Sequence, residues 1–521
     1  LCSEPIKLYL YNNNKITIKK MSIFENQNPL QFNFNEKLDT TIISPYGFRE
    51  YDARWVFPED VNHQGLEIFG FSLGIYISNR VQQGASVVIG HDYRSYSEEV
   101  KYHVAKGLLT AGCKVIDIGL ALSPMVYFAQ HHLNTDALAM ITASHNDNGW
   151  TGIKSGIEKS LTFGPDEVNE IKKIALATKD FQAQHNGTYE FKNGLRKDYL
   201  NYLTQGYKVK NKLKIVAACG NGTAGAFAPD LLRAIGCEVV ELHCRLDHSF
   251  PNYNPNPEDM VMLEDMIAAV KNHHADAAFG FDGDGDRLGV VDNIGEEIFS
   301  DKIGLMLARN VARDHPNSTF VIDVKSTGLY FHDEYLKAQN CKIEMWKTGH
   351  SHMKRRVREL NSICGFEKSG HFFINEPLGL GFDDGLMSAI LMAKLLDDND
   401  TKLSEMKSQL PLTFQSPTMA PYCGDDEKYH VVDDMIKLIL DKSNNSEKIV
   451  GQKINNVVTV NGVRFELENG SWGLIRASSN KPSLVVVIES FQSMNEVKQI
   501  FEFINEILGA TGKVGEYDQT L

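Results

Sequence analysis

The chain alternates short apolar runs with longer segments in which apolar residues recur every three or four positions. This pattern begins near Ile43. The apolar run VVIG at 87–90 is followed by the amphipathic segment 98–112 and by a second apolar run, KVIDIG, at 114–119. Short apolar runs predict buried strands, and the longer periodicity predicts an amphipathic helix. A strand, a helix and a strand in this order predict a βαβ unit of an α/β domain.

The same order of elements occurs twice more, at 214–242 and at 318–346. Three similar modules predict an internally repeated α/β architecture, in which each module ends a strand on a polar loop. After about Gln409 the pattern changes to a long helix at 427–442, followed by strand patterns such as LVVVIES at 484–490. The last part of the chain is therefore expected to form a separate, smaller α+β domain.

These changes of pattern predict the domain boundaries, and a flexible tail at the start of the chain. The first 40 residues are polar and irregular, and we expect them to pack poorly. Two interpretations of residues 1–20 stay open: an upstream read-through ahead of a true start at Met21, or a genuine flexible extension. The expected domains are 41–190, 191–298, 299–409 and 410–521.

Composition excludes several classes of protein. The chain has 521 residues, of which 42% are hydrophobic and 23% charged, which is typical of a globular protein with several cores. A formal net charge of −14 argues against a nucleic-acid surface or an anionic membrane as the main partner. No apolar run approaches the roughly 18 residues of a membrane span, and no signal peptide is recognisable. The 8 cysteines show no CxxC pairing, so we expect reduced thiols in a cytoplasmic protein.

Three aspartates at alternate positions, Asp282, Asp284 and Asp286 in FDGDGDR, are the strongest candidate site. Like charges at this spacing repel unless a cation lies among them, and a hard divalent ion suits carboxylate oxygens. An EF-hand loop would need Gly and Glu where the chain has Arg287 and Asn293, so that interpretation fails. Apolar runs on both sides predict a turn between two buried strands, at the strand end where α/β sheets bind ligands.

A second candidate site is the segment ITASHNDNGWTGIK, which follows the apolar stretch DALAM. It presents Ser144 at a strand end, with His145 beside it and Lys154 ten positions further on. A serine hydroxyl needs a base or a metal to become a nucleophile, and these neighbours could handle its proton. Taken alone, the segment is better explained as an ordinary loop with side-chain to backbone hydrogen bonds, and only the pairing with the aspartates favours a nucleophile.

Two later loops suit a phosphorylated sugar. In FEKSGHFF, Glu367, Ser369 and His371 can hydrogen-bond vicinal hydroxyls, and a capped helix start is the competing interpretation. Near the end, hydroxyls, an amide and two cations suit a phosphate, although a polar hairpin turn would look the same. These residues are Arg476, Ser478, Ser479, Asn480 and Lys481. The basic run KRRVR at 354–358 has helical spacing and is expected to be a solvated helix face.

With these four loops in order, the chain resembles the α-D-phosphohexomutases, and among them the bacterial phosphomannomutase/phosphoglucomutase group. TASHN is similar to the family's phosphoserine loop, DGDGDR to its magnesium loop, FEKSGH to its sugar-specificity loop and RASSNKP to its phosphate-binding loop. The resemblance runs from about Tyr46 to about Ala510. It implies a four-domain, heart-shaped architecture, with three related α/β domains that have mixed sheets and a C-terminal α+β domain.

The resemblance also implies the roles of particular residues. Ser144 would carry the phosphoryl group, and the three aspartates would hold Mg²⁺ together with an oxygen of phosphorylated Ser144. Glu367 and Ser369 would grip the sugar 3- and 4-hydroxyls, which are alike in glucose and mannose. The proton carriers would be Lys154, Arg54 and His350, beside His145. The other expected substrate contacts are Tyr51, Arg287, Lys325, His371, Arg476, Ser478, Asn480 and Lys481.

The implied activity interconverts hexose 1-phosphate and hexose 6-phosphate through a bisphosphorylated sugar, with glucose 1,6-bisphosphate as activator. Hexose phosphates would be the partners, without nucleic acid or membrane, and the protein would be a monomer or weak dimer. The sequence departs from the family's usual pattern at Trp55, Asp147 and Thr151, and at Phe366 and Lys368 beside the sugar contacts. The last two departures affect the choice of substrate rather than the reaction.

Three rival functions stay open. A phosphoglucosamine mutase would share the serine and metal loops. A metal-dependent phosphatase would attack with an aspartate, so that Ser144→Ala would leave it active. A non-catalytic sugar-phosphate binder would never acquire phosphate on Ser144.

Overall fold

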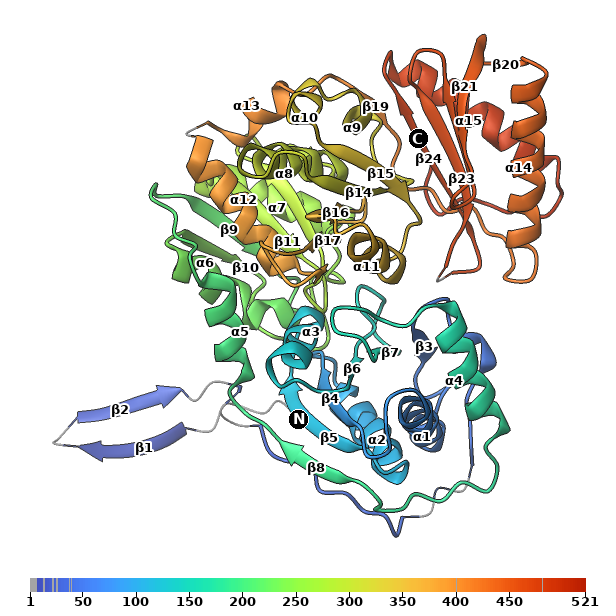
Figure 1. Ribbon diagram of the computed structural model, residues 1–521. Helices are drawn as coiled ribbons and strands as arrows, with labels where there is room; N and C mark the ends of the chain where they lie inside the picture. Colours follow the sequence, from blue (N-terminus) through green and yellow to red (C-terminus); the bar gives the residue numbers. More distant parts are fainter. Residues whose placement is uncertain are drawn as a thin grey trace. The chain divides into compact units, whose positions relative to one another are not determined.

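The computed structural model describes residues 7–12, 15–20, 23–24, 27–36, 38, 40–399, 401–479 and 481–521 (Figure 1). The chain forms two compact units, each described here by itself. Unit 1 consists of residues 1–206 with 221–227 and 245–254, and unit 2 consists of 207–220, 228–244 and 255–521. Strands β1 (Lys7–Asn12) and β2 (Lys15–Lys20) form an antiparallel hairpin near the start of the chain. Among the described residues, no helix combines the length and the apolar character that crossing a membrane requires.

Unit 1 is built on one six-stranded mixed sheet with the strand order β3-β7-β6-β4-β5-β8. Strand β4 pairs in parallel with β5 and β6, as the βαβ pattern of the sequence predicts, whereas β7 pairs antiparallel with β6 and β3. The strands are β3 (Ala53–Val56), β4 (Ser86–His91), β5 (Lys114–Leu120), β6 (Ala137–Ile141), β7 (Trp150–Gly156) and β8 (Thr188–Phe191). The helices are α1 (His63–Arg80), α2 (Ser97–Thr110), α3 (Ser123–His132), α4 (Pro165–Ala177) and α5 (Leu195–Thr204).

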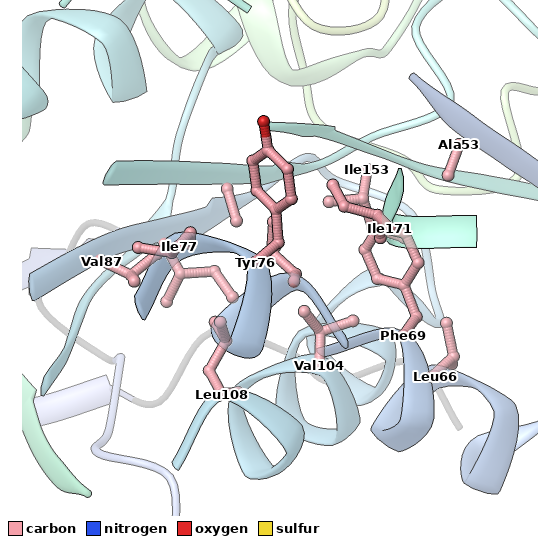
Figure 2. Close-up of a cluster of buried hydrophobic side chains, with 14 of the residues drawn as sticks. Ala53, Leu66, Phe69, Tyr76, Ile77, Val87, Val104, Leu108, Ile153 and Ile171 are labelled. Atoms are coloured by element: carbon pink, nitrogen blue, oxygen red, sulfur yellow. The ribbon is translucent and has the colours of Figure 1, made fainter. Parts of the chain in front are cut away.

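The core of unit 1 lies between this sheet and helices α1 and α2 (Figure 2). Phe69 and Tyr76 of α1 meet Val104 and Leu108 of α2 and strand residues such as Val87 there. The two helices approach closely because glycines face the contact. A Cβ atom added to Gly70 would lie 2.1 Å from the carbonyl oxygen of Val104. A Cβ atom added to Gly107 would lie 2.1 Å from the carbonyl oxygen of Glu67.

Residues 30–34, which fall in the expected flexible tail, pack against the rest of unit 1. The ring of Phe32 stacks on Tyr102 at 5.0 Å between centroids, and the ring of Phe34 stacks on His185 at the same distance. The backbone N–H of Leu30 donates to the Tyr189 hydroxyl at 2.9 Å. The sequence pattern did not reveal this packing, because isolated aromatic residues without periodicity predict no regular element.

Unit 2 contains two five-stranded mixed sheets. The first has the order β10-β9-β11-β12-β13, and the second has the order β15-β14-β16-β17-β18. The first sheet consists of β9 (Lys214–Ala218), β10 (Glu238–Leu242), β11 (Ala277–Phe281), β12 (Leu288–Asp292) and β13 (Glu297–Ile298), with helices α6 (Ala228–Ile235) and α7 (Met260–His273). The second consists of β14 (Thr319–Asp323), β15 (Lys342–Trp346), β16 (Cys364–Phe366), β17 (Phe372–Ile374) and β18 (Phe382–Asp383), with helices α8 (Ser300–Asp314), α9 (Leu329–His332), α10 (Glu334–Ala338), α11 (His350–Glu359), α12 (Gly385–Asn399) and α13 (Leu403–Ser408).

Two local expectations differ from the structure in this part of the chain. The helix expected in the module at 318–346 is present as the short α10, which begins after Asp333; the backbone of Asp333 is extended and its carboxylate accepts the N–H of Leu336 at 2.9 Å. The basic run KRRVR lies on α11, but it is not a fully solvated face. Lys354 is completely buried and its ammonium group lies 3.0 Å from the carboxylate of Asp383, which is also buried. A helical periodicity count cannot reveal such an internal ion pair.

The C-terminal part of unit 2 is the small α+β domain that the sequence predicts. Its six-stranded sheet is antiparallel throughout, in the order β19-β24-β23-β22-β21-β20. Its core is formed by this sheet and two helices. The strands are β19 (Phe414–Gln415), β20 (Lys448–Ile449), β21 (Gln452–Val458), β22 (Val463–Leu467), β23 (Trp472–Ala477) and β24 (Leu484–Ser490), and the helices are α14 (Lys428–Asn444) and α15 (Met494–Gly509).

Candidate active site

Ser144 lies in the loop that leads from strand β6 to strand β7. Ser144 is buried and has a φ of 52°, a left-handed conformation that is uncommon for a residue other than glycine. Its backbone N–H donates to the Thr142 hydroxyl at 2.8 Å. Its Oγ lies 3.2 Å from Nδ1 of His145. The loop therefore holds a strained serine beside a group that can exchange a proton with it.

One arginine that the sequence interpretation missed holds this loop in place. The guanidinium group of Arg94 donates to the carbonyl oxygens of Ser144 at 3.0 Å and Asp147 at 3.0 Å, and also to that of Asn146. Arg94 is buried and lies 3.3 Å from the Asp92 carboxylate. Its position directly after strand β4, at the same sheet edge as the serine loop, is the signal that could have revealed it.

The structure brings Arg54 to the same loop. Its Nη1 donates to Oδ1 of Asn146 at 2.8 Å, and its Nε donates to the Asp52 carboxylate at 2.9 Å. The unusual Trp55 next to it is completely buried, and its ring meets those of Phe48 and Phe69 edge to face. The side chain at this departure from the family pattern therefore fills the core.

Two further expected residues lie in unit 1. Lys154 is buried on β7, where its backbone pairs with Met140 on β6. Tyr51 is buried just ahead of β3. Both residues lie in unit 1, as the serine loop does. Thr151, another departure from the family pattern, is a buried residue of β7.

The three aspartates of FDGDGDR form the predicted turn between β11 and β12. Asp282, Asp284 and Asp286 are completely buried, and one carboxylate oxygen from each lies within 4.8 Å of the others. Gly285 has a φ of 73°, which permits the tight turn. Oδ1 of Asp282 accepts the backbone N–H groups of Asp286 and Arg287, each at 3.2 Å.

This donor set fits a hard divalent cation. Three buried carboxylates cannot all stay charged at this separation without a compensating positive charge, and oxygen donors of this kind suit Mg²⁺ or Ca²⁺. Arg287 supplies part of that charge, with its Nε 3.8 Å from Oδ2 of Asp282. The oxygen donors that the three carboxylates offer within 4.8 Å of one another make the turn a candidate metal site.

The aspartate turn and the FEKSGH segment are joined directly. The N–H of Leu288 donates to the carbonyl oxygen of Gly370 at 3.0 Å, and Arg287 and His371 form an antiparallel bridge. Nε2 of His371 lies 3.3 Å from Oδ1 of Asp286. Nδ1 of His371 lies 3.2 Å from Oε2 of Glu367. His371 therefore connects the two turns through its ring.

The charge of this histidine follows from its neighbours. Burial and the nearby Arg287 favour the neutral ring, but the carboxylates of Asp286 and Glu367 outweigh them and raise the pKa of His371 to about 9. Glu367 is also completely buried, which alone would raise the pKa of its carboxyl group. The contact with His371 and the charge of Lys325 overcome this effect and lower its pKa. The pair is therefore charged at neutral pH.

The FEKSGH segment is a tight hairpin turn between β16 and β17, not the start of a helix. The N–H of Glu367 donates to the carbonyl oxygen of His371, and that of Gly370 donates to the carbonyl oxygen of Glu367, each at 3.0 Å. Oε1 of Glu367 accepts the N–H of Gly349 at 2.5 Å. The Ser369 hydroxyl lies 3.1 Å from Nδ1 of His371. The helix-capping interpretation is wrong, because an antiparallel strand follows the turn.

The other expected residues of this region lie nearby in unit 2. His350 begins α11 and is buried, with its ring 6.1 Å from that of His371. The ammonium group of Lys325 lies 3.8 Å from the Asp323 carboxylate. Phe366, which departs from the family pattern, is completely buried on β16, so it is a core residue.

The candidate phosphate-binding residues lie in the hairpin between β23 and β24. Arg476 is buried, and its Nη2 donates to the Ser479 hydroxyl at 3.2 Å. The Ser478 hydroxyl accepts the N–H of Lys481 at 3.2 Å. Asn480, which was also expected here, lies outside the described residues. A hairpin is what both open interpretations of this segment required, so the geometry alone does not distinguish them.

Comparison with known proteins identifies the relatives of this chain. Four family descriptions match in order: phosphoglucomutase/phosphomannomutase alpha/beta/alpha domain I over residues 46–182, domain II over 197–295, domain III over 299–414 and the C-terminal domain over 428–507.

Individual relatives agree with these matches. The chain is 32% identical to a phosphomannomutase/phosphoglucomutase of Pseudomonas putida over 456 residues, which are 87% of this chain and 94% of the relative. It is 31% identical to a phosphoglucomutase of Neisseria meningitidis serogroup A over 445 residues, which are 85% of this chain and 92% of the relative. A solved structure of a phosphoglucomutase/phosphomannomutase family protein from Burkholderia thailandensis matches with a TM-score of 0.80 and 29% identity, covering 92% of this chain and all of that one.

Fold and site together define a four-domain α/β enzyme with a buried acidic turn that could hold a metal ion. The chain belongs to the phosphoglucomutase/phosphomannomutase family.

Proposed function

We propose that the protein interconverts hexose 1-phosphate and hexose 6-phosphate, with mannose and glucose as the sugars, through a phosphoserine at Ser144. The observation that carries this proposal is the strained, buried serine, held by Arg94 in a strand-end loop of a chain of this family. Family membership supports the reaction, and the buried triad of aspartates supports its dependence on a metal.

The reaction consists of two phosphoryl transfers. In the first, the O–P bond of phosphorylated Ser144 breaks as a bond forms between phosphorus and the free hydroxyl oxygen of the substrate. The proton of that hydroxyl passes to a base. In the second, the other phosphoryl group of the 1,6-bisphosphorylated sugar passes to the Ser144 oxygen, whose proton returns to the sugar oxygen through the same acid–base groups.

Asp282, Asp284 and Asp286 would hold the metal ion, which we propose to be Mg²⁺, together with an oxygen of phosphorylated Ser144. When bound, the ion neutralises charge that develops on the transferred phosphoryl group. Arg287, next to the triad and in contact with Asp282, helps to orient the phosphorylated serine.

Proton transfer falls to residues close to the reacting oxygens. His145 is the neighbour of Ser144, with its Nδ1 3.2 Å from the serine Oγ. Arg54 holds the same loop through Asn146. Lys154 and His350 are the other proposed proton carriers. Their burial would allow a substrate to change their protonation state, because a buried charge responds strongly to a new neighbour.

Sugar and distal phosphate would be bound in unit 2. We propose that Glu367 and Ser369 bind the 3- and 4-hydroxyls, which would permit both glucose and mannose because these differ only at the 2-position. A distal phosphate would be held by the hairpin between β23 and β24, where cations and hydroxyls gather. The proposed contacts beside Glu367 and Ser369 are Tyr51, Lys325, His371, Arg476, Ser478, Asn480 and Lys481.

The remaining expectations stay part of this proposal. We place the domain boundaries at 41–190, 191–298, 299–409 and 410–521. Glucose 1,6-bisphosphate would serve as the activator that phosphorylates Ser144. We expect a cytoplasmic monomer or weak dimer that binds hexose phosphates and no nucleic acid or membrane, in keeping with the net charge of −14.

The deciding experiment measures conversion of mannose 1-phosphate and glucose 1-phosphate to their 6-phosphates, with Mg²⁺ and a trace of glucose 1,6-bisphosphate. Turnover of both sugars in the wild type, and loss of at least a thousandfold in Ser144→Ala, is expected for a phosphoserine mutase. Activity that survives in Ser144→Ala would indicate a phosphatase-like mechanism. A folded protein that turns over only glucosamine phosphate, or no sugar phosphate at all, would contradict the proposal.

A further inference from the structure

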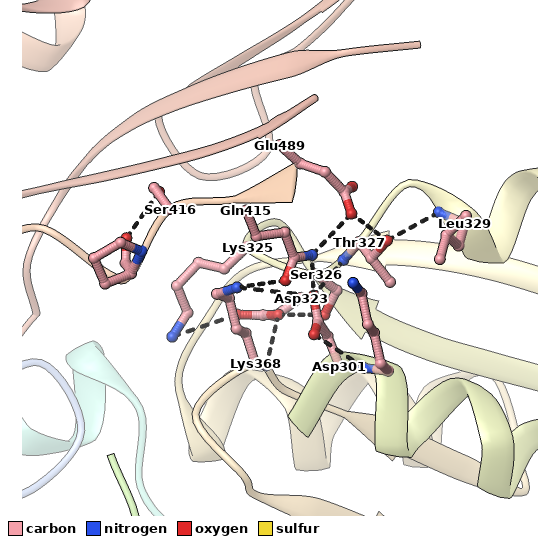
Figure 3. A network of polar contacts seen from close by, with 12 residues as sticks. Asp301, Asp323, Lys325, Ser326, Thr327, Leu329, Lys368, Gln415, Ser416 and Glu489 are labelled. Atoms are coloured by element: carbon pink, nitrogen blue, oxygen red, sulfur yellow. Dashed lines mark hydrogen bonds and ion pairs between the residues drawn. The ribbon is translucent and has the colours of Figure 1, made fainter. Parts of the chain in front are cut away.

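Lys368 lies in the FEKSGH turn, but its side chain contacts a different set of residues from those met by its neighbours in the turn (Figure 3). Its ammonium group donates to Oε1 of Gln415 at 3.2 Å and lies 4.0 Å from the Asp301 carboxylate. It also lies 4.4 Å from the centroid of the Phe299 ring. Lys368 is only 5% exposed. A lysine is buried to this extent only where partners compensate its charge, so these contacts determine its position.

Gln415 connects this lysine to the C-terminal domain. It lies on β19, and its Nε2 donates to the carboxylates of Asp301 at 3.0 Å and Glu489 at 2.8 Å (Figure 3). Glu489 on β24 in turn accepts the Thr327 hydroxyl at 2.7 Å and the N–H of Gly328 at 2.8 Å. A single amide therefore links Lys368 to a carboxylate of the C-terminal sheet and to one on α8.

The same network reaches the turn through its backbone. The N–H of Lys368 donates to Oδ1 of Asp323 at 3.2 Å, and Oδ1 of Asp323 also accepts the Ser326 hydroxyl at 2.6 Å. Arg464 of β22 donates to the carbonyl oxygens of Val324 and Ser326 at 2.8 and 2.7 Å. The loop after β14 is thus held from both sides, by the FEKSGH turn and by the C-terminal domain.

Charge makes this arrangement specific. Asp301 and Glu489, the two carboxylates that accept from the Gln415 amide, are completely buried, and the Lys368 ammonium group lies 4.0 Å from the carboxylate of Asp301. Without the charge of Lys368, the Gln415 amide would still donate to Asp301 and Glu489. The negative charge of these two buried carboxylates would then be less well compensated. The charge of Lys368, and not only its length, therefore stabilises the connection between the turn and β19.

We infer that Lys368 is a positioning residue, which fixes the turn bearing Glu367 and Ser369 to the first strand of the C-terminal domain. This inference rests on the proposed function, because its consequence is a coupling between sugar binding and the domain that carries the β23–β24 hairpin. A turn tied to β19 cannot shift its carboxylate and hydroxyl without disturbing Gln415. Lys368, which departs from the family pattern, would therefore affect substrate binding without contacting the sugar itself.

The test compares steady-state constants for mannose 1-phosphate and glucose 1-phosphate. Lys368→Met keeps the length of the side chain and removes its charge. It is expected to raise KM about tenfold for both sugars while kcat changes less than threefold, because the turn loses its fixed geometry and the phosphoserine centre does not. Lys368→Arg, which keeps the charge, is expected to recover most of the loss. Gln415→Met should act in the same direction, and the double variant should be no worse than the worse single variant.

Lys101→Met is the matched control. Lys101 is as buried as Lys368, and its ammonium group lies 2.9 Å from Asp117 on β5, a strand without expected site residues. Its loss should lower the midpoint of thermal unfolding and leave KM within twofold of the wild type. This outcome separates positioning of the turn from general loss of stability.

An unchanged KM in folded Lys368→Met, or additive effects of the Lys368 and Gln415 substitutions, would overturn the inference. If Lys368→Met does not fold, Gln415→Met and Lys368→Arg provide the same comparison. Should the wild type turn over neither sugar, the proposed function fails, and calorimetric binding of glucose 6-phosphate replaces the assay. A tenfold weaker Kd in Lys368→Met then supports the positioning role, and an equal Kd refutes it.

Discussion

Oδ1 of Asp286 and Nε2 of His371 lie 3.3 Å apart and join the aspartate turn to the turn that carries the candidate sugar contacts. The carboxylate belongs to the β11–β12 turn and the imidazole directly precedes β17. A charged histidine beside a metal ligand compensates part of the negative charge of the triad. It also makes the geometry of one turn depend on the protonation of a residue in the other.

His371→Gln should remove a pH-dependent part of the stability in protein kept free of divalent cations. The folded pKa of about 9 lies above the value of 6.5 for a free histidine, so the contribution is fully present below pH 6.5. Between pH 6.5 and 9 the native state holds a proton that the unfolded state has lost, and stability falls as pH rises. The free energy of unfolding of the wild type should therefore lose about 3 kcal/mol relative to the variant over this range.

Urea titrations at pH 6, 7.5 and 9 measure this difference. His430→Gln, at an exposed position of α14, is the control and should keep the wild-type slope. A wild-type stability that stays parallel to that of His371→Gln across the range would show that His371 is not held in its charged form by its neighbours.

Asp284→Asn tests the role of the carboxylate triad. In EDTA the variant should be about 1 kcal/mol more stable than the wild type, because one of three buried like charges is removed. Addition of Mg²⁺ should raise the thermal midpoint of the wild type by several degrees and that of the variant much less. Thermal unfolding with and without Mg²⁺ measures both effects. Asp434→Asn, at an exposed site on α14, should change neither. Equal responses of wild type and Asp284→Asn to Mg²⁺ would argue against metal binding at this turn.

Arg94 offers a test of the serine loop that spares its reactive groups. Arg94→Met removes three hydrogen bonds to loop carbonyl oxygens, and kcat should fall about a hundredfold because Ser144 loses its fixed geometry. The control is Arg196→Met, since Arg196 also donates twice to one backbone carbonyl, that of Ala226, away from the loop. Steady-state assays of both folded variants measure this difference. Comparable losses of kcat would show that the hydrogen bonds of Arg94 to the serine loop have no special role in catalysis.

The parts of the fold that the sequence predicts are those with strong periodicity. The segment 98–112 predicts α2 to within two residues of its ends, and the apolar run 277–281 coincides with β11. The strand-end positions of Ser144 and the aspartate triad follow from the same patterns, since a polar loop after a buried strand needs no tertiary information.

Contacts between distant segments could not be predicted in this way. Arg94 holds a loop fifty residues further on, and a guanidinium group in a polar loop has no signature of what it will bind. Lys354 lies in a run of basic residues that resembles a solvated helix face, yet its partner Asp383 is supplied by β18. The residues around Phe32 lack periodicity and still pack on Tyr102. In each case the sequence pattern does not reveal which distant segment of the chain will lie next to the residue.

Lys354→Met should destabilise the protein by about 3 kcal/mol, because the buried Asp383 carboxylate loses its nearest cation and keeps only the charged His371, 4.0 Å away. The double variant Lys354→Met/Asp383→Asn should recover about 2 kcal/mol of that loss, as the uncompensated charge is then removed. Chemical denaturation of the two variants gives these values. Lys394→Met breaks a partly exposed ion pair with Asp398 and should cost less than about 1 kcal/mol. A double variant no more stable than the single one would mean that packing of the lysine stem, rather than charge, sets the cost.

Gly70→Ala tests the close approach of α1 and α2. The added methyl group would lie 2.1 Å from the backbone carbonyl oxygen of Val104, which cannot move without displacing α2. The loss of stability should be about 3 kcal/mol, although alanine is the better helix former. Gly509→Ala at the end of α15 is the matched substitution, where the added Cβ would have no atom within 4 Å. It should raise stability by about 0.5 kcal/mol. Opposite signs for the same chemical change establish that helix contact, and not helix propensity, requires the glycine in α1; a neutral Gly70→Ala would show that the two helices can separate at little cost.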